Sequence, residues 1–321
     1  MSRQDINATL KNRERTLVMG VLNITEDSFS DGGRYLEPEA ALAHAREMVA
    51  QGADILDIGA ESTRPGAVRV PEEVEKERIL GAVTHLVREF PDLPLSIDTT
   101  RASVARAALE AGAHIINDVS GGKLDPELPR VVAQYPDCLY IVQHWRTWLG
   151  QDGSAQSEKT TTHYANGVVD DTYEELQSQV LAVRAAGVQP GQIIIDPGLG
   201  FSKPTIDHNV PLILNTEHLS HMGYPVLIGA SRKRFVAAMI REAGQEDSEE
   251  TRDMMTASLS VIAAERGAWA VRVHDVARNR LAIEVAQQVR ASKNQLLDRL
   301  SDQLSQTMNI PNMSADISID I

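Results

Sequence analysis

Eight short apolar segments recur along the chain, and each one ends in a polar or charged residue. They span residues 17–23, 54–59, 94–98, 114–118, 138–144, 193–196, 225–229 and 269–275. The segments are rich in Val, Ile and Leu and are bounded by Gly, Pro or Asp. That pattern is typical of strands buried on both faces, as in a parallel sheet.

Helical patterns lie between these segments and complete a regular alternation. We expect helices over residues 38–51, 71–90, 101–111, from 125 onward, and over 170–186, 207–221, 252–266 and 277–289. Strict alternation requires a parallel sheet, because parallel neighbours need a long crossover. Residues 17–289 give about 34 residues for each of eight units, the size of a βα repeat.

This count favours a single-domain (β/α)₈ (TIM) barrel of the α/β class. A doubly wound sheet would instead favour a Gly-rich turn after the first strand, where the chain has Asn23-Ile24-Thr25. We expect an N-terminal arm over 1–16, the barrel over 17–289 and a C-terminal extension over 290–321. The extension begins as a continuation of the last helix and ends in a flexible tail. Long loops over 23–35 and 61–70 follow the first two strands.

Composition excludes several classes of protein. The chain has 31 basic and 45 acidic residues, a formal charge of −14, which argues against a general nucleic-acid binder. A single cysteine, Cys138, excludes an internal disulfide framework and fits a reducing compartment. No apolar run approaches the ~18 residues of a membrane helix, and the polar first 15 residues do not resemble a signal peptide. We therefore expect a cytoplasmic protein with no membrane or nucleic-acid partner.

Polar side chains mark every strand end. They are Asn23, Asp57 with Glu61, Asp98, Asn117 with Asp118, His144, Asp196, Ser231-Arg232-Lys233, and Arg272 with His274. Any one of them could simply cap a helix; Asp98, for example, could cap the helix that starts near Arg101. A barrel, however, directs all eight carboxyl ends of its strands into one mouth, so the full set indicates a binding site.

The chemistry of these residues divides into two kinds. Asp98, Asn117 and Asp196 suit the adjacent N–H donors of a nitrogen-rich heterocycle such as a 2-amino-pyrimidinone. Lys233, Arg272 and His274, beside a helix N-terminus at Ser231, suit a phosphate or diphosphate. Asn23 offers a carbonyl oxygen to a Mg²⁺ ion that keeps most of its waters. Structural ion pairs between the cations and the carboxylates are the alternative interpretation. Lys203 is expected to contact solvent at the rim or to tether a loop.

Seven motifs in order resemble those of the dihydropteroate synthases. They are MGVLNITEDSFSDGG (19–33), DIGAESTRPG (57–66), SIDTT (96–100), INDVSGG (116–122), DPGLGF (196–201), SRK (231–233) and RVHD (272–275). The resemblance spans residues 17–289. It implies a (β/α)₈ enzyme of folate biosynthesis that joins (7,8-dihydropterin-6-yl)methyl diphosphate to 4-aminobenzoate with Mg²⁺. The products would be 7,8-dihydropteroate and diphosphate.

The resemblance also implies roles for single residues. The pterin would be held by Asp98, Asn117, Asp196 and Lys233. The diphosphate end would be contacted by Thr63, Arg272 and His274, and the metal by Asn23. Two loops would shape the aminobenzoate pocket, where sulfonamides would compete, with Phe29, Asp31, Arg64 and Pro65. Asp98, Lys233, Arg272 and His274 would be catalytic. A homodimer through the late helices is also implied.

The reaction itself stays a hypothesis at this stage. No matched motif supplies a Ser or Cys nucleophile, which favours an SN1-like displacement of diphosphate. Two other functions remain open: a pterin-binding methyltransferase of the methyltetrahydrofolate–corrinoid type, and a non-catalytic paralogue that binds pterin or a protein. The complete cationic set Lys233, Arg272 and His274 argues against both.

Overall fold

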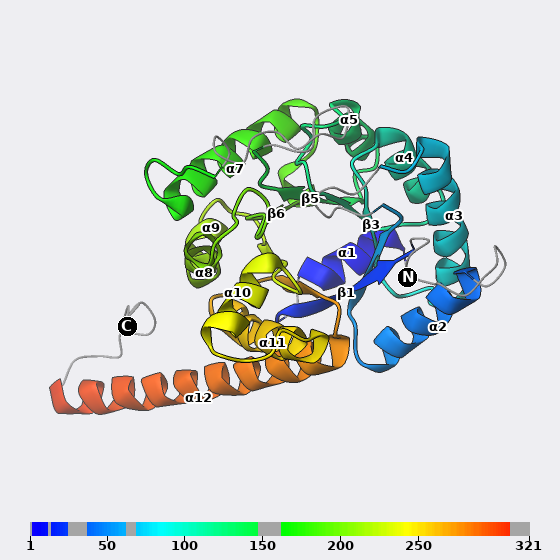
Figure 1. Cartoon of the computed structure of the whole chain (residues 1–321). Coiled ribbons are helices and arrows are strands. Elements are labelled where there is room, and N and C mark those ends of the chain that lie inside the picture. Colours follow the sequence, from blue (N-terminus) through cyan, green and yellow to red (C-terminus); the bar gives the residue numbers. More distant parts are fainter. Residues whose placement is uncertain (1, 12–13, 25–36, 62–68, 147–161, 309–321) are drawn as a thin grey trace.

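The computed structural model describes residues 2–11, 14–24, 37–61, 69–146 and 162–308. Within these ranges, eight parallel strands form one sheet in the order β6-β5-β4-β3-β2-β1-β8-β7. A bridge between Ile195 and Val226 brings the two edge strands together, which completes the predicted barrel (Figure 1). The strands are β1 Leu17–Asn23, β2 Ile55–Gly59, β3 Leu95–Asp98, β4 Ile115–Asp118, β5 Leu139–Gln143, β6 Ile193–Asp196, β7 Leu227–Ile228 and β8 Ala270–Val273.

Helices surround the strands in a ring (Figure 1). The ring contains α2 Glu37–Ala50, α3 Glu72–Glu89, α4 Ala102–Glu110, α5 Glu127–Ala133, α7 Val168–Ala185, α8 Ile206–Leu214, α9 Thr216–Ser220, α10 Arg234–Glu242, α11 Glu249–Glu265 and α12 Val276–Met308. A further helix, α1 Arg3–Lys11, lies across the end of the barrel, and a 3₁₀ turn spans Pro190–Gln192. No helix within the described ranges is long and apolar enough to cross a membrane.

The helical pattern differs from the sequence prediction in three places. The stretch 207–221, predicted as one helix, is divided into α8 and α9 at Asn215. The Asn215 side chain donates to the Pro211 carbonyl (2.8 Å) at that break. Two helices lie outside the predicted set: α1, and α10, which directly follows Lys233. The predicted end of the chain, residues 309–321, lies outside the described residues.

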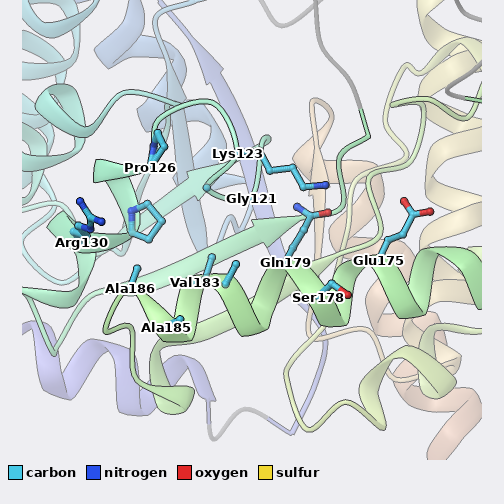
Figure 2. A pocket seen from close by; sticks show the side chains of 13 residues that line it. Gly121, Lys123, Pro126, Arg130, Glu175, Ser178, Gln179, Val183, Ala185 and Ala186 are labelled. Carbon is cyan, nitrogen blue, oxygen red and sulfur yellow. The ribbon is translucent and has the colours of Figure 1, made fainter.

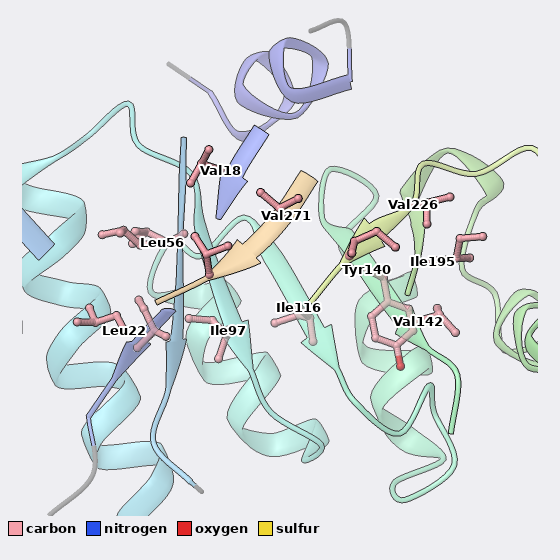
Figure 3. Close-up of a cluster of buried hydrophobic side chains, with 14 of the residues drawn as sticks. Val18, Leu22, Leu56, Ile97, Ile116, Tyr140, Val142, Ile195, Val226 and Val271 are labelled. Carbon is pink, nitrogen blue, oxygen red and sulfur yellow. The ribbon is translucent and has the colours of Figure 1, made fainter. Parts of the chain in front are cut away.

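Alternation along the strands separates two hydrophobic layers. One cluster lies between the strands and the helices and includes Leu56, Ile97 and Ile116 (Figure 3). The other contains residues of opposite parity, such as Met19 and Ile55, and it fills the barrel interior. Successive side chains of a strand point to opposite faces. The polar side chains are those that face the barrel interior at the carboxyl ends of the strands, beyond this apolar layer.

Helix α1 closes the amino end of the barrel. Ile6 and Leu10 are buried in the interior cluster with Leu17 and Leu139, and Trp269 Nε1 donates to the Leu10 carbonyl (3.0 Å). The predicted N-terminal arm is therefore a helix packed on the barrel. Because this end is filled with apolar side chains, the opposite, carboxyl end is the one open for a site.

Candidate active site

The strand register places the polar residues in one layer. Asn23 pairs with Gly59, Gly59 with Asp98, and Asp98 with Asn117. Gly59 lies between the two side chains, since a Cβ atom built on it would be 3.6 Å from both Asn23 Oδ1 and Asp98 Cβ, which is ordinary van der Waals contact. Asn23 and Asp98 therefore approach each other across β2 at the carboxyl end of the barrel.

A pocket at this end gathers residues from several strands and the loops that follow them. Its lining includes the predicted residues Asn117, Asp196, Lys233, Arg272 and His274, together with Val119, Gln143, Leu199, Phe201, Gly229 and Ser231. Asp98 adjoins this set through Arg272. The predicted convergence of distant motifs is thus present in the folded chain.

Arg272 connects two buried carboxylates. Its Nε donates to Asp57 Oδ2 (2.6 Å) and its NH2 group donates to Asp98 Oδ2 (2.8 Å). The Asn117 Nδ2 amide donates to the same Asp57 oxygen (3.0 Å). The ion-pair interpretation of Arg272 is therefore confirmed, and it leaves the remaining donors of the guanidinium for a ligand.

The alternative role for Asp98 as a helix cap is wrong. The Ala102 N–H at the start of α4 donates to Asp125 Oδ2 (2.8 Å), and the Arg101 N–H donates to Thr99 Oγ1 (3.2 Å). Other side chains therefore satisfy the first donors of that helix, and the Asp98 carboxylate is directed to Arg272 instead.

Asp196 and Lys233 occupy the other side of the pocket. Asp196 Oδ1 accepts a hydrogen bond from the Gly198 N–H (2.6 Å), which fixes the carboxylate at the start of the loop. The Lys233 ammonium lies over the ring of Phe201, 4.1 Å from its centroid. Within the described residues Lys233 forms no salt bridge, so its ammonium is available to a ligand.

Burial perturbs the titration of these groups. It raises the pKa of Asp98 to about 7, although Arg272 opposes the change, and it raises the pKa of Asp196 to about 6. Burial and the charge of Arg272 lower the pKa of Lys233 to about 8. Perturbed groups that share a cleft are typical of functional sites.

The side of the pocket predicted to bind an anion is built on β7, β8 and α10. Ser231 Oγ lies 2.9 Å from His274 Nδ1 and accepts a hydrogen bond from the His274 N–H (3.2 Å). Helix α10 begins at Arg234, so its amino end adjoins Ser231 and Lys233. A helix N-terminus next to cationic side chains favours a phosphate group.

The donor set suits a weakly held Mg²⁺ ion. Within the described residues no group of three or more His, Cys, Asp or Glu side chains could form a metal cage. Asn23 is half-buried, and among the described residues its side-chain amide has no hydrogen-bond partner. Mg²⁺ commonly takes few protein ligands and completes its shell with water and substrate phosphate oxygens, so the residues fit the ion.

Five of the predicted site residues lie outside the described residues: Thr63, Phe29, Asp31, Arg64 and Pro65. The stems of the second loop are described. Arg69 forms an ion pair with Glu61 through three hydrogen bonds (3.0, 3.3 and 3.1 Å) and donates to Thr100 Oγ1 (2.8 Å). The two ends of this loop are therefore held together beside β3.

Three residues in the site had no predicted role. Asp57 stands at a predicted strand end, and the structure makes it the shared acceptor of Arg272 and Asn117. Gln143 lines the pocket and donates to the Val119 carbonyl (3.1 Å). Phe201 faces Lys233. The parity of β2 and β5 places Asp57 and Gln143 inside the barrel, so the strand pattern could have identified both.

Comparison with known proteins identifies the family of this chain. The model of the pterin binding enzyme family matches residues 19–274. The dihydropteroate synthase of Mycobacterium leprae is 46% identical over 269 residues, covering 84% of this chain and 91% of that protein. The Bacillus subtilis enzyme is 39% identical, with 84% and 87% covered.

Solved structures show the same fold. The dihydropteroate synthase of Xanthomonas albilineans with 4-aminobenzoic acid has a TM-score of 0.75 and 39% identity, covering 87% of this chain and 94% of that one. The Burkholderia cenocepacia enzyme complexed with 7,8-dihydropteroate has a TM-score of 0.75 and 36% identity, with 88% and 94% covered. The chain belongs to the pterin binding enzyme family, among its dihydropteroate synthases.

Proposed function

We propose that the pocket at the carboxyl end of the barrel binds (7,8-dihydropterin-6-yl)methyl diphosphate and transfers its pterin-methyl group to 4-aminobenzoate. Asp196 and Asn117 hold the pterin ring, since their oxygens accept from its N–H donors. Lys233 and Asp98 flank the ring. Arg272, His274 and Thr63 contact the diphosphate end, and Phe29, Asp31, Arg64 and Pro65 surround the aminobenzoate. Sulfonamides compete at that last subsite.

The residues favour an SN1-like displacement. Arg272 and His274 stabilise the charge that develops on the departing diphosphate. Asp98 offsets the positive charge on the pterin methyl carbon through space, without a covalent bond. The aniline nitrogen of aminobenzoate then attacks this carbon, and it loses a proton to solvent. A covalent adduct between the enzyme and the pterin would contradict this order of events.

Mg²⁺ is the cofactor that fits, with Asn23 as its protein ligand. When bound, the ion neutralises charge on the diphosphate and makes it a better leaving group. The single amide ligand predicts weak binding of Mg²⁺ alone and tighter binding when the diphosphate is present. Asn23→Leu should therefore raise the Mg²⁺ concentration needed for half-maximal activity.

The observation that carries the proposal is the pairing of Asp98 with Arg272 beside Asp196 and Lys233 in one pocket. The test is diphosphate release from the pterin diphosphate, with and without 4-aminobenzoate and Mg²⁺. Release should require Mg²⁺, and with 4-aminobenzoate present dihydropteroate should form in an amount equal to the diphosphate released. Release of diphosphate without dihydropteroate when 4-aminobenzoate is present would contradict the assigned reaction.

The activity of Lys233→Ala distinguishes the interpretation of the chain as an enzyme from its interpretation as a non-catalytic paralogue. Removing one charge-stabilising donor typically costs ~10²–10³ in rate. The control is Lys123→Ala, because the Lys123 ammonium donates to the Trp145 carbonyl (2.6 Å) and does not line the pocket. A rate within twofold of wild type for Lys233→Ala would favour the paralogue.

We also place the chain in the cytoplasm as a homodimer. Its one cysteine, Cys138, is buried and free, which suits a reducing compartment. Helix α12 carries exposed apolar side chains, namely Leu281, Val285, Val289, Leu296 and Leu300. Most helical stability in proteins comes from packing of an apolar face, so a second copy that covers these side chains would stabilise the helix.

A further inference from the structure

Lys203 is a buried lysine that the proposed chemistry does not use. Only 1% of its surface is exposed, which contradicts the expected solvent contact at the rim. Removing an ammonium from water is costly unless it is compensated, and burial lowers the pKa of Lys203 to about 7. A methionine of similar length would avoid that cost, so the amine must supply donors that the loop requires.

The amine reaches three acceptors. Lys203 Nζ lies 2.8 Å from His144 Nδ1 and 3.4 Å from the carbonyl oxygens of Gly198 and Phe201. His144 Nε2 is 3.0 Å from Glu175 Oε2. Burial and the charge of Lys203 lower the pKa of His144 to about 3, so the imidazole stays neutral. It therefore accepts from Lys203 through Nδ1 and donates to Glu175 through Nε2.

The side chains connected to Lys203 through His144 belong to elements other than the loop that follows β6. Glu175 belongs to α7 and lies with Gln179 and Lys123 at one end of the groove between α5 and α7 (Figure 2). Arg146 donates to both oxygens of Glu175 (2.9 and 2.7 Å) and lies over the Tyr164 ring, 3.7 Å from its centroid. Lys203 thus ties the loop to a connected set of side chains around β5.

The loop is held in a conformation that it would not adopt unaided. Ser202 has φ +53°, a left-handed conformation that is unfavourable for a residue with a side chain. Gly198 has φ +67°, and a Cβ there would lie 2.3 Å from the His144 carbonyl oxygen. Such strain persists only where surrounding contacts determine the backbone, and Lys203 contacts the carbonyl groups on both sides of Gly200.

The loop in turn sets two groups of the active site. The N–H of Gly198 fixes Asp196, and the ring of Phe201 stacks on the Lys233 ammonium. The aromatic face favours the charged form of the lysine. We propose that Lys203 is a positioning residue, which anchors residues 198–201 to His144 and thereby holds Phe201 against Lys233.

This inference rests on the role assigned to Lys233, and a double-mutant cycle tests it. The four proteins are wild type, Lys203→Met, Phe201→Leu and the double variant, each assayed for kcat and KM with both substrates across pH 6–9. If Lys203 acts through Phe201, Lys203→Met should lower kcat/KM about tenfold in wild type and less than about twofold in Phe201→Leu. It should also lower the pKa of the alkaline limb in the pH profile of kcat/KM by about half a pH unit, because the charged form of Lys233 loses its cation–π stabilisation.

The control is Lys123→Met, since Lys123 donates to the Trp145 carbonyl beside the same cluster without touching the loop. It should keep kcat/KM within twofold of wild type. Losses that multiply in the double variant, or an unmoved alkaline limb, would overturn the proposal. If Lys203→Met does not fold, Lys203→Gln, whose side chain is uncharged and one atom shorter, takes its place in the cycle with the same expected losses.

A crystal structure of the Lys203 variant gives a readout that does not depend on activity. We expect the Phe201 ring to leave the Lys233 ammonium. A loop unchanged from wild type would overturn the positioning role, whereas a wild-type chain that makes no dihydropteroate would contradict the enzymatic assignment instead.

Discussion

Replacing Arg272 with methionine should destabilise the protein by leaving two buried carboxylates without their shared cation. Arg272 makes two charge-assisted hydrogen bonds, to Asp57 (2.6 Å) and Asp98 (2.8 Å), and these carboxylates are 0% and 8% exposed. Removing one partner of a buried ion pair typically costs ~3–5 kcal/mol. We expect a destabilisation at the lower end of this range, because Asn117 still donates to Asp57 and Asp98 can take up a proton.

The loss should depend on pH. The pKa of Asp98 is about 7 with Arg272 present, and removal of that positive charge raises it further. A carboxyl group whose pKa is raised in the folded state stabilises most at low pH, and that stabilisation is lost as pH rises through the folded pKa. The difference between variant and wild type should therefore grow from pH 6 to pH 9.

The assay is urea denaturation followed by circular dichroism at pH 6, 7.5 and 9. Arg278→Met is the matched control, because Arg278 forms an exposed ion pair with Asp275 (2.7 Å) and such pairs contribute ~0–1 kcal/mol. A loss in free energy of unfolding below about 1 kcal/mol for Arg272→Met, or one that does not change with pH, would refute the charge-compensation argument.

The site and α12 support three other predictions. The pH profile of kcat/KM should be bell-shaped. Asp98, with a pKa of about 7, must be deprotonated, and Lys233, with a pKa of about 8, must be protonated. An acidic limb that is unchanged in Asp98→Asn would contradict this assignment. Gly198→Ala should lower the affinity for pterin, measured by calorimetry. The new Cβ would lie 2.3 Å from the His144 carbonyl oxygen and would displace the N–H that binds Asp196. Gly244→Ala is the control and should retain that affinity, because Gly244 has a similar φ and a Cβ there meets nothing within 4 Å. Light scattering should give a dimer for wild type and a monomer for Val285→Glu with Leu296→Glu, whereas a dimer in both would remove α12 from the interface.

The barrel and most of its site follow from local patterns in the sequence. A short apolar run identifies each strand, and for β1 and β6 the predicted bounds are those that the structure shows. Asp98, Asn117, Asp196, Lys233 and Arg272 can be grouped because parallel strands end at one mouth. That inference needs only the alternation of elements, and no knowledge of side-chain contacts.

Other features depend on contacts that no local pattern carries. The first 15 residues look polar as a whole, yet Ile6 and Leu10 are buried because the amino end of the barrel supplies an apolar partner. The sequence left Lys203 either in contact with solvent or tethering a loop, and its burial depends on His144, 59 residues away. The pairing of Arg272 with Asp57 spans 215 residues, and several strand-end carboxylates were equally good candidate partners for that arginine.

The most direct test of the central claim is a crystal structure of the protein soaked with a dihydropterin. We predict that the pterin ring lies in the pocket lined by Asn117, Asp196, Lys233 and Arg272, with its N–H donors on the Asp196 carboxylate. A pterin bound instead in the groove between α5 and α7, or one that does not contact both Asp196 and Lys233, would contradict the account.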